Sequence, residues 1–318
     1  MDGFRIPLGS WVATGVDWIK TNLDGLLDVI SFVVSFLVDG LTRALLSPHF
    51  VVIIVIAAFI AWLVRSWQLA IGTVISFGLI VAMGLWVPAM QTLALVLVAA
   101  AIAVLIAVPL GIWSARNATV RAVLKPVLDF MQTMPAFVYL IPAIVFFSIG
   151  VVPGLVATVI FALPPGVRLT ELGIRGVDSE TVEAGHAFGA TPAQILRGIQ
   201  LPLAMPTIMA GVNQVIMLAL SMAVVAGIVG ADGLGKEVVQ SISTVNLPKG
   251  VEAGLSVVIL AVYLDRLTAA LGSREGNTSS LLAALGRRRG PGAPAADAAG
   301  EAERHVASPR RAPISTGA

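Results

Sequence analysis

The side chains that most often carry out catalysis or bind metal ions are scarce in this sequence. Its 318 residues contain no cysteine and only three histidines, His49, His186 and His305. Disulfides, iron–sulfur clusters and Cys-ligated zinc are therefore excluded, and three histidines offer few ligands for a His-based metal site. A Gly-rich phosphate loop followed by Lys and Ser or Thr is also missing. We expect no catalytic residues, no metal site and no cofactor bound by this chain, which is not expected to be an enzyme.

The polar residues that stand out gather in one segment, residues 179–202, between two apolar stretches. Ser179 can cap a first short helix, whose first turn holds acidic side chains that suit the helix dipole. Gly189 can adopt the left-handed conformation that ends this helix. The segment therefore begins as a helix followed by a tight turn.

A second short helix is expected directly after the turn. Thr191 and Gln194 have the spacing of a capping box, and Pro192 suits the first helical position. Pro202 is expected to end this helix. Residues 179–202 are thus predicted to form an elbow of two helices, with small residues that a partner surface can approach closely.

The elements that must carry this elbow are apolar. The sequence is 57% hydrophobic and 12% charged, whereas soluble domains have about 25% charged residues. A helix needs about 20 residues to cross about 30 Å of hydrocarbon, and we expect an all-α polytopic membrane protein with about seven spans. The expected spans are 49–64, 69–86, 89–113, 133–149, 151–169, 206–229 and 251–271.

Positive charge falls in every second connection between these spans. Basic residues lie at Arg65, within 116–125, within 168–197 and from Arg266 onward, whereas the alternate connections carry little net charge. The positive-inside rule then places the elbow and the C-terminus in the cytoplasm and the N-terminus outside.

The two ends of the chain differ from the spans. In residues 1–48, apolar residues recur at helical spacing from Val16 to Leu41, with Val33 and Leu37 on the apolar face and acidic residues opposite. This pattern predicts an amphipathic extracytoplasmic helix that lies on the membrane surface or covers neighbouring helices. Residues 273–318, rich in Gly, Ala, Pro and Arg, are expected to be a disordered cytoplasmic tail that follows the membrane domain 49–272.

The elbow resembles the EAA signature of ABC importer permeases, which reads Glu-Ala-Ala, three residues, Gly, nine residues, Ile-x-Leu-Pro. Gly185 stands where the signature usually has Ala. In that family the elbow is the coupling helix, which seats in a cleft of a cytoplasmic ATPase. The residues that take this role by match are Glu183, Ala184, Gly185, Gly189, Ile199, Leu201 and Pro202.

The region of about 89–271 is similar to the glycine betaine/proline permease branch, most clearly in segments 133–142, 161–170 and 200–214. The resemblance implies a type I ABC importer permease fold in the bacterial inner membrane, and a role in ATP-driven import of compatible solutes. It implies a homodimer in the lipid bilayer, a separate ATPase that binds ATP and Mg, and an extracytoplasmic solute-binding protein. No nucleic-acid partner is expected, because the basic residues lie in short loops and in the tail. The alternative is an ion-coupled secondary transporter or an osmoregulatory channel, but the spans hold almost no charge for a coupling ion.

Four residues are candidates for the substrate path. Asn213 and Gln214 are strongly polar for the middle of a span, although hydrogen bonding between helices is the alternative role. Tyr139 and Phe137 could present aromatic faces to a quaternary ammonium group, with packing as the alternative.

Overall fold

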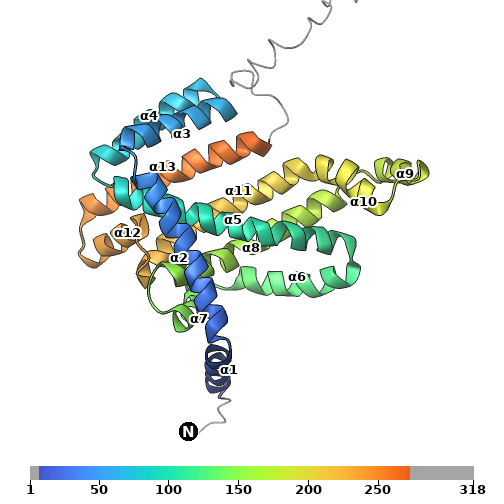
Figure 1. Cartoon of the computed structure of the whole chain (residues 1–318), viewed down its shortest axis with the longest axis horizontal. Helices are drawn as coiled ribbons and strands as arrows, with labels where there is room; N and C mark the ends of the chain where they lie inside the picture. The colour runs from blue at the N-terminus through green and yellow to red at the C-terminus, as the bar shows by residue number, and fades with distance from the viewer. Residues whose placement is uncertain (1–6, 273–318) are drawn as a thin grey trace, which may run out of the picture.

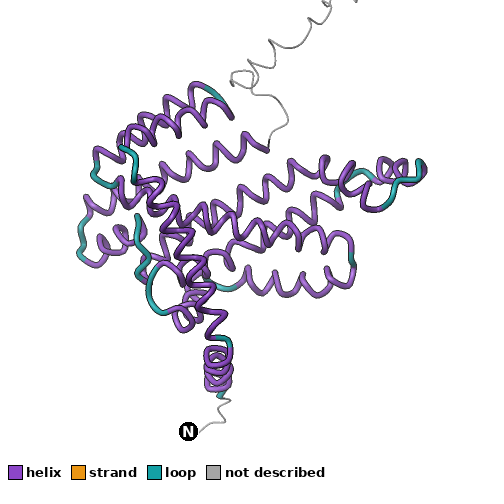
Figure 2. Tube along the Cα trace, viewed as in Figure 1, coloured by secondary structure: helices purple, strands orange, loops and turns teal. Residues whose placement is uncertain are grey.

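The computed structural model describes residues 7–272, and this part of the chain is built from helices without strands (Figures 1 and 2). The predicted all-α class is confirmed there, whereas the expected tail, residues 273–318, lies outside the described residues. The α-helices are α1 Leu8–Asn22, α2 Asp24–Leu46, α3 Phe50–Val64, α4 Trp67–Ala82, α5 Trp86–Arg116, α6 Ala118–Thr133, α7 Ala136–Phe147, α8 Val151–Arg175, α9 Ser179–Ala187, α10 Pro192–Ile195, α11 Leu201–Ala226, α12 Leu234–Ser243 and α13 Leu247–Gly272. A π-helical turn, Leu196–Gln200, joins α10 to α11, and a 3-10 turn, Gly227–Val229, follows α11.

Helices α5, α8 and α11 pack together at the centre of the bundle, with α13 against α11 (Figure 1). Small residues let their backbones approach closely. A Cβ atom added to Gly166 of α8 would lie 2.8 Å from the Cβ of Ala107, and one added to Gly111 of α5 would lie 2.5 Å from the Cβ of Thr170. Lipid tails are as apolar as the surfaces of the helices, so the hydrophobic effect does not drive membrane helices together. Close packing of this kind holds them together instead.

The structure divides the apolar sequence differently from the seven spans expected. Five stretches are long and apolar enough to cross a membrane: α2, α5, α8, α13 and the stretch Pro192–Val229. Helices α3 and α4 have only 15 and 16 residues and pack against each other. At about 1.5 Å per residue they are about 23 Å long, which is short for a bilayer core of about 30 Å.

The expected span 133–149 is not one straight helix. It corresponds to α7, which is bent by 99° against α6 at a short break. Met134 is extended in the break, with ψ 133°, because a residue before proline is disfavoured in the helical conformation. Pro135 then starts α7, so α6 and α7 form a broken span or a re-entrant loop.

The N-terminal segment forms two helices, α1 and α2, separated at Leu23. The face of α2 that packs is shifted from the expected one, of which Ile30 and Leu41 still pack against the core. Val34 and Val38 are buried, whereas Val33 and Leu37 are exposed. Its neighbours α5 and α8 decide which side of α2 is covered.

Helix α2 passes the length and hydropathy test for a span, but it runs across α5 and α8 and not along them (Figure 1). A small cavity beside it is lined by Asp39 of α2, Gln91 near the start of α5 and Val151 at the start of α8. These starts lie away from α9, so α2 crosses the bundle on the side of α5 and α8 that is remote from the elbow (Figure 1).

Candidate functional site: the helical elbow

The elbow projects from one end of the bundle, where α9 lies beyond the ends of α8 and α11 (Figure 1). Its first helix, α9, is capped by Asp178 and not by Ser179 as expected. The Asp178 carboxylate accepts hydrogen bonds from the backbone N–H groups of Glu180, at 3.4 Å, and Thr181, at 3.2 Å. Ser179 is already the first helical residue, and aspartate also places negative charge at the positive end of the helix dipole.

The Thr181 hydroxyl adds a third bond to the Asp178 carboxylate, at 2.9 Å. These hydrogen bonds lower the pKa of Asp178 below its ordinary value. The Thr181 hydroxyl contributes most, followed by the backbone N–H groups of Thr181 and Glu180. The cap therefore stays ionised at neutral pH, which keeps the start of α9 fixed.

The turn between the two elbow helices has the conformation that the sequence predicted. Gly189 has φ +77°, and its N–H donates to the carbonyl of His186 at 2.9 Å. The capping box is present: the Thr191 hydroxyl accepts from the N–H of Gln194, and the Gln194 side chain accepts from the N–H of Thr191 at 2.7 Å. Only glycine adopts this left-handed turn without strain, so the direction of the elbow depends on Gly189.

The second elbow helix does not end at Pro202, contrary to the expectation. Residues 192–229 form one continuous helical stretch, and Pro202 lies in the first turn of α11 directly after the π-helical turn. The wider π turn accommodates a proline ring that would clash with the preceding turn of a regular α-helix. The elbow is therefore joined rigidly to the long membrane helix α11.

Gly185 of the EAA-like motif lies where α9 meets the second helix of the elbow. A Cβ atom on Gly185 would lie 2.9 Å from the Cδ1 of Ile199 and 3.3 Å from the Cγ1 of Ile195, so α9 lies against the second helix through this residue. Glu183 and Ala184 are exposed on the outer side of α9. The fold therefore separates motif residues that hold the elbow together from those that face outward.

Leu201 also belongs to the inner set. It is half-buried against a cluster that contains Leu196 and Ile174, at the junction of the elbow with α8 and α11.

The sequence analysis missed the most exposed apolar side chain of the elbow. Phe188 ends α9 directly before Gly189 and is 92% exposed. The ring therefore makes almost no packing contact within the described chain. The signal available in the sequence was an aromatic residue beside the turn glycine of an otherwise polar segment.

The four path candidates occupy different environments. The Asn213 amide donates to Asp265 Oδ1 of α13 at 3.0 Å and accepts from the Thr268 hydroxyl, so it joins α11 to α13. Gln214, the next residue, is exposed and has no such partner among the described residues.

The aromatic candidates also separate. The Tyr139 ring is buried in an edge-on contact with Phe161, 5.7 Å between centroids, and its hydroxyl donates to the carbonyl of Met131. Phe137 is 56% exposed. Asn213 and Tyr139 therefore hold helices together, whereas Gln214 and Phe137 are exposed on the described chain.

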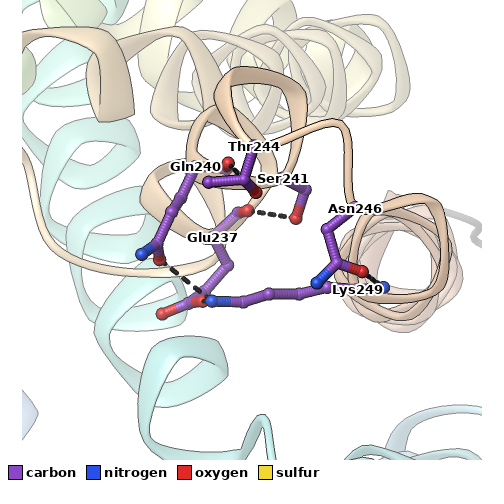
Figure 3. A network of polar contacts seen from close by, with 6 residues as sticks. All are labelled: Glu237, Gln240, Ser241, Thr244, Asn246 and Lys249. Carbon is purple, nitrogen blue, oxygen red and sulfur yellow. Dashed lines mark hydrogen bonds and ion pairs between the residues drawn. The ribbon is translucent and has the colours of Figure 1, made fainter.

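The end of the bundle opposite the elbow carries balanced charges. The Lys249 ammonium lies 2.6 Å from Glu237 Oε2 and 2.9 Å from Gln240 Oε1, which ties α12 to the start of α13 (Figure 3). Lys236 pairs with Asp232 at 2.7 Å on the surface. Lys236 and Lys249 thus each have an acidic partner.

Comparison with known proteins agrees with this geometry. Residues 107–276 match the family model described as binding-protein-dependent transport system inner membrane component. The chain is 49% identical over 264 residues to the glycine betaine transport system permease protein OpuAB of Bacillus subtilis, covering 83% of this chain and 94% of that protein. It is 47% identical over 267 residues to the glycine betaine/proline betaine transport system permease protein ProW of Escherichia coli, covering 84% and 75%.

The fold is similar to a solved structure of the MetNI methionine ABC transporter in an inward-facing conformation. The TM-score is 0.55 at 24% identity, over 59% of this chain and 94% of that chain. These similarities favour a permease of an ABC importer over an ion-coupled carrier, a channel or an enzyme. The chain belongs to the family of binding-protein-dependent transport system inner membrane components, and it is a multi-pass permease subunit of the bacterial inner membrane.

Proposed function

We propose that this permease imports glycine betaine, proline betaine or a similar compatible solute, with ATP and Mg bound by a separate ATPase. The relatives named for these solutes share almost half of their residues with this chain over most of its length. A related permease of Listeria monocytogenes, 48% identical over 273 residues, is named for glycine betaine and carnitine. A solute-binding protein on the outer side would deliver the solute.

In this proposal the ATPase moves the membrane helices through the elbow. Its rigid connection to α11 means that a displacement of α9 is passed to a membrane helix that packs against α8 and α13. Two ATPase copies that close on binding ATP would draw together the elbows of two permease copies and turn α11 in each. Glu183, Ala184 and Phe188 form the outward surface that would enter the ATPase cleft.

We propose that the elbow is cytoplasmic, with the N-terminus outside. The elbow end carries Arg116, Arg121, Arg175 and Arg197, whereas Lys236 and Lys249 at the opposite end are paired with acidic residues. The positive-inside rule favours this orientation. Helix α2, with exposed Phe32 and Phe36 side chains, would then lie along the outer membrane surface.

The proposed path runs along one face of α11. Thr207, Gln214 and Ser221 recur every seven residues on this helix; Gln214 and Ser221 are exposed, and Thr207 is half-buried. Polar side chains are costly against lipid, so this face is expected to meet the path or the second permease copy. Phe137 would contribute an aromatic face beside the path.

Transport in reconstituted vesicles tests this proposal. The chain would be assembled with its ATPase and binding protein, and ATP-driven uptake of labelled glycine betaine would be measured beside ATP hydrolysis. Gly189→Val forces a β-branched residue into a left-handed turn, so uptake per ATP should fall at least tenfold. Gly198→Ala, at a position with nothing within 4 Å of the added Cβ, is the matched control. Equal coupling in Gly189→Val and the parent would refute the elbow mechanism, and uptake without ATP would refute the importer itself.

A further inference from the structure

A cavity of about 650 Å³ lies between α6 and α8 near the elbow end of the bundle. Its walls come from the first three turns of α6 and the last two turns of α8. Four of its side chains are basic, one is acidic, and the others are apolar; they are Ala118, Arg121, Ala122, Lys125, Leu128, Arg168, Glu171, Leu172 and Arg175.

Helical spacing brings the charges to one place. Arg121 and Lys125 are four residues apart on α6, and Arg168 and Arg175 are seven apart on α8, so each pair lies on a single helix face. The two faces meet because α6 packs against α8 through Leu128, which is buried.

The acidic residues nearby compensate only part of this charge. Arg168 pairs with Asp129 of α6, and Glu171 accepts a hydrogen bond from the buried Ser114 hydroxyl at 2.7 Å. The side chains of Arg121, Lys125 and Arg175 form no ion pair or hydrogen bond with other described residues. Three cations without partners therefore face one cavity in which a single carboxylate is already held by a hydroxyl.

We propose that this cavity binds a phosphate-bearing anion. Arginine and lysine are the usual ligands of phosphate, and basic pockets between membrane helices on the cytoplasmic side bind lipid headgroups. The volume is large compared with the roughly 30 Å³ of one water molecule and leaves room for a phosphate diester. The anion comes from an anionic phospholipid or from free phosphate, and the two sources are separable by experiment.

Binding to the purified full-length chain in detergent tests the site. Short-chain phosphatidylglycerol would be titrated by native mass spectrometry, and inorganic phosphate by equilibrium dialysis. Arg121→Gln with Lys125→Gln should weaken binding about 25-fold, at about fivefold per cation. Arg175→Gln alone should weaken it about fivefold, and Lys125→Arg should retain it. The matched control, Lys20→Gln with Arg65→Gln, removes two cations elsewhere and should stay within twofold.

Each result decides the question. Site-dependent binding of phosphatidylglycerol without phosphate identifies a lipid site, and site-dependent binding of phosphate identifies a free-anion site. Binding that is unchanged in the double variant, or that weakens equally in the control, overturns the proposal, because the basic residues then act only as a diffuse positive flank. The proposal does not depend on solute transport, and its failure would leave the docking of the elbow untouched.

Discussion

Replacing Phe188 with alanine tests whether the elbow docks through its exposed aromatic side chain. The ring is 92% exposed in the described chain, so its removal breaks almost no internal packing. If docking buries it, about 2 kcal/mol of apolar transfer free energy is gained, and its loss corresponds to about a 30-fold weaker affinity for the ATPase. The dissociation constant would be measured by biolayer interferometry with the detergent-solubilised permease and the purified ATPase.

Leu247→Ala is the matched control for this measurement. Leu247 is 75% exposed and begins α13, at the end of the bundle opposite the elbow (Figure 1). Its truncation removes a similar apolar side chain without touching the elbow, and the affinity should stay within twofold of the parent. An unchanged dissociation constant for Phe188→Ala, with the protein folded, would refute the assignment of Phe188 to the docking surface.

Three further predictions concern stability and pH. Gly227→Ala places a Cβ atom 2.3 Å from a backbone carbon of α12 and should destabilise the protein by about 2 kcal/mol in thermal unfolding, whereas Gly254→Ala, with nothing within 4 Å, should not. Asn213→Leu removes the donor to Asp265 and should cost about 1 kcal/mol by the same measurement; an unchanged melting temperature would contradict the interhelical role. The lowered pKa of Asp178 means that its cap is fully present above the ordinary carboxylate pKa and is lost only as pH falls through the lower folded value. ATPase binding should therefore be constant from about pH 6 to 8 and weaken only in acid, and Asp178→Asn should remove this acid dependence.

The sequence by itself determined the features that depend on neighbours along the chain. Hydropathy specified an all-helical membrane protein, because each span must satisfy its own backbone hydrogen bonds in lipid. The turn at Gly189 and the capping box of Thr191 and Gln194 were predictable for the same reason, since a cap is made within four residues. The shift of the first cap from Ser179 to Asp178 is an error of one residue between two good capping types.

The tertiary structure decided the features that depend on distant partners. Asn213 could have faced the path or another helix, and its pairing with Asp265, 52 residues away, follows from the packing of α11 on α13. The covered side of α2 and the charged cavity between α6 and α8 are set in the same way. An apolar or basic helix carries no local mark of the face that its neighbour will cover. Local patterns therefore predict caps and tight turns, whereas packing assigns the faces of the helices.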